Sequence, residues 1–190
     1  MKTEIKICGI TRREDAEYAV ECGADYIGVV LVPSSKRFVD MKLLAELTDN
    51  LPCQKVGVFA DADLDFIRQA VHVGKLDIVQ LHGKESAEFA GQIKDVKVWK
   101  ATYEMDFPAE RLICDAIRGG SGMFGDHIKA AQLARVKTVM LAGGITPDNA
   151  VSLIEKVRPT GIDLSSGVEI SPGIKNHQKI KQLFSNMKGL

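Results

Sequence analysis

Short apolar runs rich in valine and isoleucine recur along the whole chain, and a longer amphipathic stretch follows most of them. Eight runs have the length and composition of strands: 4–10, 25–31, 54–59, 77–82, 96–102, 111–116, 138–143 and 161–166. The helical patterns are 12–22, 41–50, 63–73, 84–92, 126–134, 147–157 and 175–187. Alternating strands and helices form parallel sheets, and eight such units predict an α/β fold, a (β/α)8 TIM barrel.

One connection is too short for a crossover helix. Only residues 103–110, which include Pro108, separate the fifth and sixth predicted strands, so we expect a single turn or an extended loop there. With 190 residues the chain is near the lower size limit of the barrel class, and we expect one domain, 1–190. The alternative is an open doubly wound sheet, which would usually carry a nucleotide-binding fingerprint after a strand. The sequence shows none of the expected form.

Two helix starts carry local signals. Thr11 with Glu14 has the S/T-x-x-E form of a capping box, which predicts a helix beginning just after Ile10. Thr146 followed by Pro147 predicts an N-cap and a proline at the first helical position.

The charge balance argues against two classes of partner. Acidic and basic residues number 25 each, without a long run of one sign, so we expect neither nucleic-acid nor membrane-surface binding. We also expect no signal peptide and no membrane-spanning segment. The four cysteines are scattered, which predicts no zinc site, no disulfide framework and a reduced, cytoplasmic setting.

In a barrel of this type, functional groups collect at the carboxyl ends of the strands. Cys8 falls at such an end, although burial as a small hydrophobic residue is the commoner fate of a cysteine. Arg37 follows the second strand, where an anion-binding role and a solvated surface role are equally supported. His82 ends the fourth strand and either packs at the barrel top or faces the site.

Two glycine-containing loops follow the seventh and eighth predicted strands. The first contains Gly143 and Gly144, and the second contains Ser165, Ser166 and Gly167. Glycines before a helix expose backbone N–H groups, and in barrels these two loops form the usual phosphate site. The glycines could instead serve only tight turns, but their occurrence at both loops favours phosphate binding.

A glycine-rich segment, 119–125, follows the sixth predicted strand and leads directly to Asp126. Its composition is typical of a mobile lid or of a disordered surface loop. By position alone, Asp126 is either a catalytic acid or, more commonly, the N-cap of the next helix.

These motifs together resemble those of the phosphoribosylanthranilate isomerase family of tryptophan biosynthesis, and the resemblance covers essentially the whole chain. The matching segments are Lys6-Ile7-Cys8-Gly9-Ile10-Thr11, Val79-Gln80-Leu81-His82-Gly83, Gly119-Gly120-Ser121-Gly122, Ala142-Gly143-Gly144-Ile145 and residues 163–175. The first and last of these motifs are highly specific.

The resemblance implies an activity and roles for residues. The family converts the aminoaldose N-(5-phosphoribosyl)anthranilate into the aminoketose 1-(2-carboxyphenylamino)-1-deoxyribulose 5-phosphate, without a metal or an organic cofactor. Its general base falls on Cys8, its general acid on Asp126, and its arginine for the anthranilate carboxylate on Arg37. The same motifs place His82 and Asp163 in the substrate-binding set. The implied partner is a small phosphorylated substrate, and the chain is a monomer or a homodimer.

This chemistry needs an ionisable base at Cys8. Strand alternation places Lys6 on the same face as Cys8, so we expect positive charge beside the thiol and a Cys8 pKa near or below the free value of about 8.5. Two alternatives remain open: the histidine-pathway aminoaldose isomerase, which usually has aspartates in both roles, and a non-catalytic phosphate-binding barrel. The second arises because the acid loop reads Gly125-Asp126-His127 where the family usually has Phe-Asp-Trp.

Overall fold

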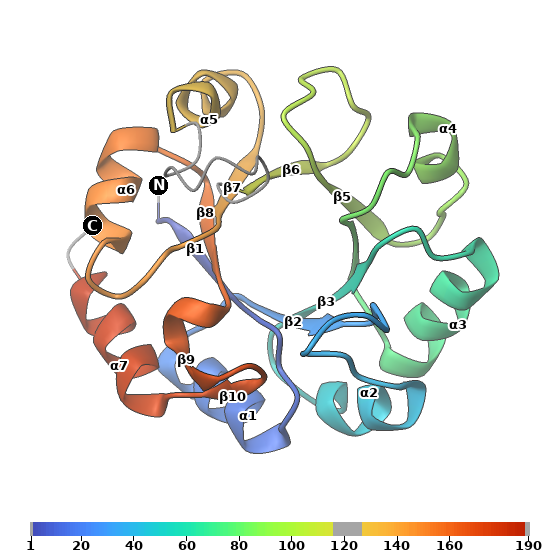
Figure 1. Cartoon of the computed structure of the whole chain (residues 1–190), viewed down its shortest axis with the longest axis horizontal. Helices are drawn as coiled ribbons and strands as arrows, with labels where there is room; N and C mark the ends of the chain where they lie inside the picture. Colours follow the sequence, from blue (N-terminus) through green and yellow to red (C-terminus); the bar gives the residue numbers. More distant parts are fainter. Residues whose placement is uncertain (1, 116–126, 189–190) are drawn as a thin grey trace.

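The computed structural model describes residues 2–115 and 127–188. Eight parallel strands pair in chain order, and β8 closes the barrel on β1 (Figure 1). The strands are β1 (Glu4–Cys8), β2 (Tyr26–Val30), β3 (Gln54–Phe59), β4 (Ile78–Leu81), β5 (Lys97–Ala101), β6 (Arg111–Asp115), β7 (Val139–Ala142) and β8 (Gly161–Leu164). The predicted (β/α)8 barrel is therefore confirmed, and the open sheet is excluded.

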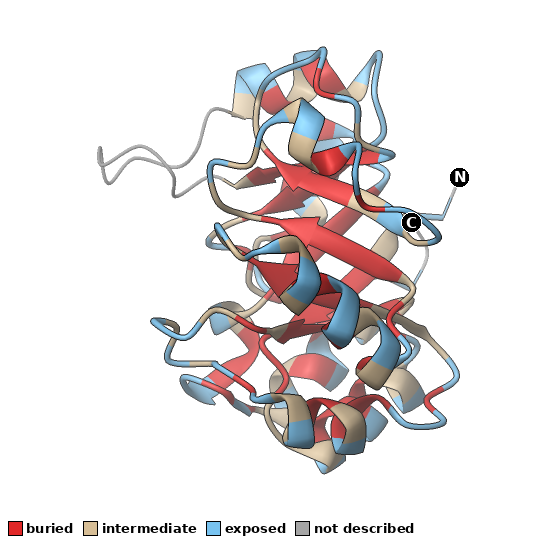
Figure 2. Cartoon of the chain, turned by 90° about the vertical axis from the view of Figure 1, so that its right-hand side faces the viewer, coloured by how far each residue is buried: buried red, intermediate tan, exposed pale blue. Residues whose placement is uncertain are grey.

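Helices surround the barrel on its outside (Figure 1). They are α1 (Arg13–Cys22), α2 (Met41–Thr48), α3 (Leu64–Gly74), α4 (Ala87–Ala90), α5 (His127–Ala134), α6 (Ala150–Val157) and α7 (His177–Asn186). Exposed residues gather on the outer sides of these helices, whereas the strands are mostly buried (Figure 2). Across the described residues, no helix combines the length and the apolar character needed to cross a membrane.

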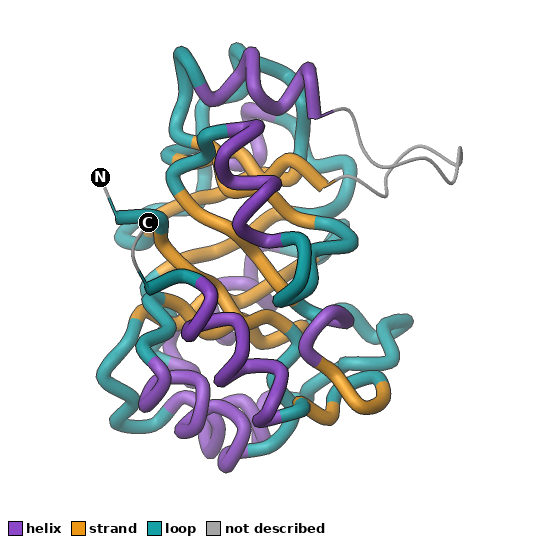
Figure 3. The backbone as a smooth tube through the Cα atoms, turned by 90° about the vertical axis from the view of Figure 1, so that its left-hand side faces the viewer, coloured by secondary structure: helices purple, strands orange, loops and turns teal. Residues whose placement is uncertain are grey.

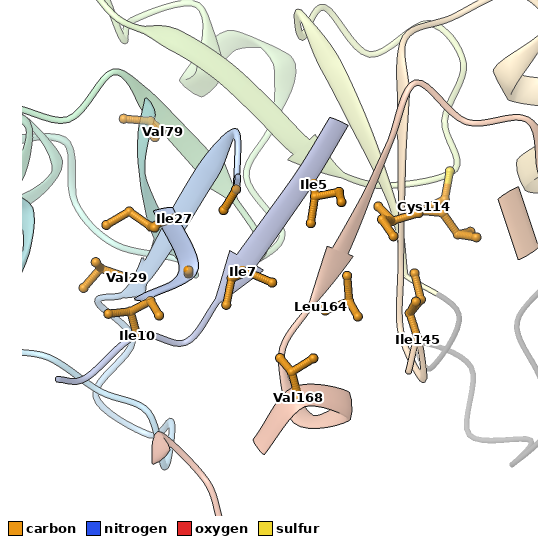
Figure 4. Close-up of a cluster of buried hydrophobic side chains, with 14 of the residues drawn as sticks. Ile5, Ile7, Ile10, Ile27, Val29, Val79, Cys114, Ile145, Leu164 and Val168 are labelled. Atoms are coloured by element: carbon orange, nitrogen blue, oxygen red, sulfur yellow. The ribbon is translucent and has the colours of Figure 1, made fainter. Parts of the chain in front are cut away.

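Side chains of each strand alternate between two packed layers. One layer lies between the barrel and the helices, and Ile5 and Ile7 of β1 belong to it (Figure 4). The other fills the barrel interior and includes Cys8, Tyr26, Val56, Val58, Ile78, Trp99, Ala101, Ile113, Met140 and Ala142. The buried Lys6 lies on the same face of β1 as Cys8, as the alternation predicted.

The fifth crossover contains no helix, which confirms the predicted shortening. Residues 102–110 form a loop whose ends are held by backbone hydrogen bonds from Thr102 to Ile113 and from Glu110 to Val98. Phe107 from this loop is buried, and the Lys100 ammonium lies 5.7 Å from the centre of its ring. In this unit the buried Phe107 side chain therefore covers the part of the barrel that a crossover helix covers in other units.

Both signalled helices form, but α1 begins one residue and α6 three residues later than the sequence pattern predicted. α1 begins at Arg13 with Arg12 as its N-cap, and the Thr11 hydroxyl donates a hydrogen bond to the Gly173 carbonyl (2.5 Å) instead of capping the helix. α6 begins at Ala150, after a turn that Asn149 stabilises by accepting a hydrogen bond from the Thr146 N–H (2.8 Å). The helix predicted at 84–92 is shorter than expected, since the Ser86 side chain caps it at the Phe89 N–H (3.2 Å) and it ends at Ala90.

An additional element follows β8. The chain forms a short 3-10 helix, η1 (Ser166–Val168), and then a hairpin of β9 (Glu169–Ser171) and β10 (Ile174–Lys175). Figure 3 shows this hairpin at the end of the barrel away from the start of β1. It therefore lies at the carboxyl ends of the parallel strands, beside the loops that the sequence singles out.

Candidate active site

A cavity of about 370 Å³ opens at the carboxyl ends of the strands. Its walls come from the carboxyl ends of β1, β2, β3, β4, β6, β7 and β8 and from the loops after β2, β3, β4, β7 and β8. The lining residues are Cys8, Val30, Val32, Ser35, Arg37, Val58, Ala60, Gln80, His82, Asp115, Ala142, Gly143, Gly144, Ile145, Asp163, Ser165 and Ser166. Eight of the ten residues that the sequence nominates thus share one cavity.

The other two nominated residues lie elsewhere or outside the description. Gly167 does not line the cavity, and a Cβ atom built on it would lie 1.8 Å from the Ile145 carbonyl oxygen. Its small size therefore allows the loops after β7 and β8 to touch. Asp126 and the predicted 119–125 lid lie outside the described residues.

Cys8 ends β1 and faces the cavity, yet it is only 8% exposed. Burial raises the pKa of its thiol and outweighs the neighbouring Lys6 ammonium, which acts to lower it. The expectation of a pKa near or below the free value is therefore wrong for the ligand-free protein, because the barrel interior withholds the water that would solvate a thiolate.

Lys6 is fully buried beneath Cys8 in the barrel interior. Its ammonium donates to Asp163 Oδ2 (2.7 Å) and to Gln80 Oε1 (2.9 Å). Burial acts to lower the Lys6 pKa, but the charges of Asp163 and Cys8 together with hydrogen bonds to both raise it overall. The ion pair thus joins β1 to β8, and the Gln80 amide joins both to β4.

Arg37 reaches the cavity rim from the loop after β2, where Glu169 holds its guanidinium. Two nearly parallel hydrogen bonds join Arg37 Nε to Oε1 (2.8 Å) and Nη2 to Oε2 (2.6 Å) of this carboxylate. Lys175 donates both to Glu169 Oε1 (2.8 Å) and to the Cys8 carbonyl (2.5 Å). A continuous chain of contacts therefore connects Arg37 to the backbone of Cys8 through the hairpin.

Sequence reasoning missed Glu169 and Lys175 as parts of the site. Their signal was their place in the motif at 163–175, which follows β8 directly. It also missed Gln80 and Asp115, which line the cavity at the ends of β4 and β6. These two carry the weaker signal of polar residues at strand ends.

His82 faces the cavity near Asp115. Its Nε2 lies 3.6 Å from Asp115 Oδ2, and its Nδ1 lies 3.4 Å from the Gln80 side-chain nitrogen. The histidine therefore combines the two alternatives that the sequence left open, since it packs at the barrel top and also lines the cavity.

The loops after β7 and β8 form one side of the cavity. Gly143 and Gly144 both have positive φ, 84° and 68°, a conformation that other residues rarely adopt. The Asn149 side chain donates to the Gly144 carbonyl (3.0 Å) and fixes the turn. Ser165 precedes η1, so this side has the loop-and-short-helix form of barrel phosphate sites.

Among residues 2–115 and 127–188, no group of three His, Cys, Asp or Glu side chains is arranged to hold a metal ion. The chemistry that the described cavity offers comes instead from a thiol, an imidazole, carboxylates and a guanidinium. Such a set supports proton transfer on an anionic substrate.

The sequence profile described as N-(5'phosphoribosyl)anthranilate (PRA) isomerase matches residues 5–186. Curated relatives include the N-(5'-phosphoribosyl)anthranilate isomerases of Geobacter sp. strain M21, 37% identical over 99% of both chains, and of Acaryochloris marina, 40% identical over 98% of both.

Solved structures agree with these relatives. The Thermus thermophilus phosphoribosyl anthranilate isomerase superposes with a TM-score of 0.90 at 36% identity, covering 97% of this chain and 98% of that one. A phosphoribosyl anthranilate isomerase in complex with reduced 1-(o-carboxyphenylamino)-1-deoxyribulose 5-phosphate gives 0.88 at 33% identity, covering 99% and 100%. A match over nearly the full length in profile, sequence and structure shows that the chain belongs to the N-(5'-phosphoribosyl)anthranilate isomerase family.

Proposed function

We propose that this protein is an aldose–ketose isomerase that carries out the Amadori rearrangement of N-(5-phosphoribosyl)anthranilate in tryptophan biosynthesis. The product is 1-(2-carboxyphenylamino)-1-deoxyribulose 5-phosphate. The observation that carries the proposal is the shared cavity, in which Cys8, Arg37 and the loops after β7 and β8 converge in a chain of this family. The family assignment makes the histidine-pathway isomerase the weaker alternative.

The cavity offers a place for each part of this substrate. The phosphate would bind at Gly143, Gly144, Ser165 and Ser166, which line one side. The anthranilate carboxylate would bind Arg37 on the loop after β2, because a guanidinium recognises a carboxylate through paired hydrogen bonds. The ribose would then lie over Cys8, between the two anions.

Arg37 is already engaged by Glu169, so a substrate carboxylate must bind the part of the guanidinium that Glu169 does not use. Glu169 takes the Nε and Nη2 edge. The edge formed by Nη1 and the second N–H of Nη2 remains for the incoming carboxylate, and the fixed fork offers it without a loss of side-chain freedom on binding.

Two proton transfers define the reaction. Asp126, as general acid, would protonate the ribose ring oxygen while the ring opens to a Schiff base. Cys8, as general base, would then remove the proton from C2′, and the resulting enamine would tautomerise to the ketone. The Cys8 thiol must give up its proton first, which the raised pKa makes rare in the ligand-free protein. Asp163 and His82 would bind the sugar hydroxyls from the cavity wall.

Two further expectations belong to this proposal. All four cysteines lie in the described part of the chain and none is disulfide-bonded, which supports a cytoplasmic setting. The relative from Thermotoga maritima is described as dimeric, which supports a homodimer as one of the two expected states.

The test is a direct assay. The substrate is generated from anthranilate and phosphoribosyl pyrophosphate by the preceding transferase, and its fluorescence is followed after the protein is added. We expect rapid loss of fluorescence with the wild type. An Asp126→Asn variant should lose about 10²–10⁴-fold in kcat. A wild-type protein that leaves the fluorescence unchanged would contradict the proposed function, and an Asp126→Asn variant with wild-type kcat would contradict the role of the acid.

A further inference from the structure

Lys6 is a buried cation at the base of the cavity. Its side chain has no solvent exposure, and it is held from two strands by Gln80 and Asp163. A buried ammonium is costly unless its charge serves a pair. The Asp163 carboxylate pairs with this ammonium, and Cys8 is the next inward-facing residue of the same strand.

The side chains of Lys6 and Cys8 both lie against Gly28. Gly28 of β2 pairs with Cys8 in the sheet, and a Cβ atom built on Gly28 would lie 2.7 Å from Cys8 Sγ and 3.0 Å from Lys6 Cε. The sulfur and the lysine side chain therefore flank one point on the barrel wall. A larger residue at position 28 would displace both.

The charged groups around Cys8 carry a net positive charge while Cys8 is a neutral thiol. Three cations face it: Lys6 from β1, Lys175 from β10 at its carbonyl, and Arg37 from the loop after β2. Asp163 and Glu169 supply two negative charges. The net charge of this group is therefore positive, and ionisation of Cys8 to the thiolate would neutralise it. Across the cavity, the His82 imidazole lies 3.6 Å from the Asp115 carboxylate.

Of the three cations, Lys6 is the one that does not bind Glu169. Arg37 donates two hydrogen bonds to Glu169, and Lys175 donates one to Glu169 and one to the Cys8 carbonyl. Lys6 has a single carboxylate partner, and the other oxygen of that carboxylate, Asp163 Oδ1, is buried without a hydrogen-bond partner. Asp163 is thus a carboxylate that opposes ionisation of Cys8 and at the same time anchors Lys6.

We propose that Lys6 is the counter-ion of the Cys8 thiolate: its ammonium, fixed by Gln80 and Asp163 beneath the cavity, compensates the negative charge that forms when Cys8 gives up its proton. Lys6 is a positioning residue, because it acts on the substrate only through Cys8. The inference rests on the proposed role of Cys8 as the base, but it concerns a property of the ligand-free protein.

Removing the Lys6 charge and removing the Asp163 charge should change the rate of Cys8 alkylation in opposite directions. Cys8 alkylation by iodoacetamide is followed at fixed pH by peptide mass spectrometry, which separates Cys8 from the other cysteines. Lys6→Met should slow alkylation about tenfold, because loss of a neighbouring opposite charge shifts a pKa by about one unit or more. Asp163→Asn should accelerate it, since it removes a negative charge and leaves Lys6 to face the sulfur. Unchanged rates in both variants would overturn the proposal.

A double variant separates charge from structure. Lys6→Met alone leaves Asp163 buried without its cation and could destabilise the fold, whereas Lys6→Met with Asp163→Asn removes both charges. We expect the double variant to react more slowly than Asp163→Asn alone, by about the factor that Lys6→Met produces. If Lys6 served only to neutralise Asp163, the double variant would react as fast as Asp163→Asn, and the proposal would fail.

The matched control is Lys100→Met. Lys100 of β5 forms another buried lysine–carboxylate pair, with Glu85 at 2.7 Å, but Lys100 does not line the cavity that Cys8 faces. Its removal should leave the Cys8 alkylation rate within twofold of wild type. An equal slowing in Lys100→Met would show a general effect of losing a buried cation, and would overturn the assignment to Lys6.

Kinetics connect this result to the reaction while keeping the two proposals distinct. In an active enzyme, Lys6→Met should lower kcat about tenfold at pH 7 and recover part of it as the pH rises, with less change in KM. If the wild type shows no isomerase activity, the proposed function fails, but the alkylation rates still decide whether Lys6 is the counter-ion.

Discussion

The two ends of the barrel both contain buried charge, but they use it differently. At the amino ends of the strands, Arg111 pairs with Glu4 (2.6 Å) and lies 4.7 Å from the Trp99 ring centre and 5.5 Å from that of Tyr26. At the carboxyl ends, the charged groups surround a cavity. A single strand, β1, reaches both ends: Glu4 belongs to the amino-end ion pair, whereas Lys6 and Cys8 belong to the cavity at the carboxyl end.

At the amino end, the rings of Tyr26 and Trp99 pack against the Arg111 guanidinium. Although a recess also opens at the amino end, Arg111 Nε and Nη1 are shut off from solvent, and Tyr26 donates its hydroxyl to Glu4 (2.8 Å). Burial and this hydrogen bond raise the pKa of Tyr26 to about 12, so the Tyr26 hydroxyl stays protonated near neutral pH. We infer that the amino end stabilises the fold and that the carboxyl end carries the chemistry, as is usual in barrels.

The largest expected effect on substrate binding is at the carboxyl end. Arg37→Met should raise KM for N-(5-phosphoribosyl)anthranilate about 100-fold, because it removes a charge-assisted pair of hydrogen bonds to the substrate carboxylate. Lys36→Met removes a neighbouring but exposed cation and should leave KM unchanged. Steady-state kinetics compare the two, and equal increases in KM would mean that only the general charge of the loop matters.

The contrasting change is at the amino end. Arg111→Met should lower the free energy of unfolding by about 2 kcal/mol, since it strands the partly exposed Glu4 and leaves Tyr26 and Trp99 without their stacked cation. The value of kcat should stay within twofold of wild type. Urea denaturation and the isomerase assay test this pair of results, and a loss of kcat at unchanged stability would reverse the assignment of the two ends.

The smallest expected effect is a pH dependence of stability. Burial acts to raise the pKa of Glu169, but hydrogen bonds from Arg37 and Lys175 outweigh it and hold the pKa below its ordinary value of 4.5. A carboxylate with a lowered pKa in the folded state stabilises the protein above its unfolded pKa, and this stability is lost as the pH falls through the folded pKa.

Glu169→Gln should therefore reduce the acid-induced loss of stability by about 1 kcal/mol between pH 6 and pH 3. Glu14→Gln, at an exposed carboxylate on α1, is the control and should change nothing measurable. Thermal unfolding at several pH values gives both slopes, and parallel curves for Glu169→Gln and wild type would contradict the lowered pKa.

The barrel was predictable from sequence because its signals are local. Apolar runs and their spacing gave all eight strands, and the run at 54–59 coincides with β3 (Gln54–Phe59). The inward position of Lys6 and Cys8 followed from alternation, and the missing fifth helix followed from chain length. Each inference needed only the order of residues within one segment.

Several features that the sequence did not predict involve partners that are distant in sequence. The Thr11 hydroxyl binds Gly173, 162 positions away, and so does not cap α1. Glu169 and Arg37, which form a salt bridge, are 132 positions apart, and no local sequence pattern indicates this contact. The Cys8 pKa was misjudged because a neighbouring lysine is visible in the sequence, whereas the degree of burial is not.

The role of Cys8 is the central claim, and kcat of a Cys8→Ala variant tests it most directly. Cys53→Ala, at a half-buried cysteine near the amino end of β3, is the matched control and should keep wild-type kcat. The account predicts that Cys8→Ala loses about 10²–10⁴-fold in kcat while its unfolding midpoint stays close to that of the wild type. A correctly folded Cys8→Ala variant that retains more than half of the wild-type kcat would contradict the assignment of Cys8 as the base.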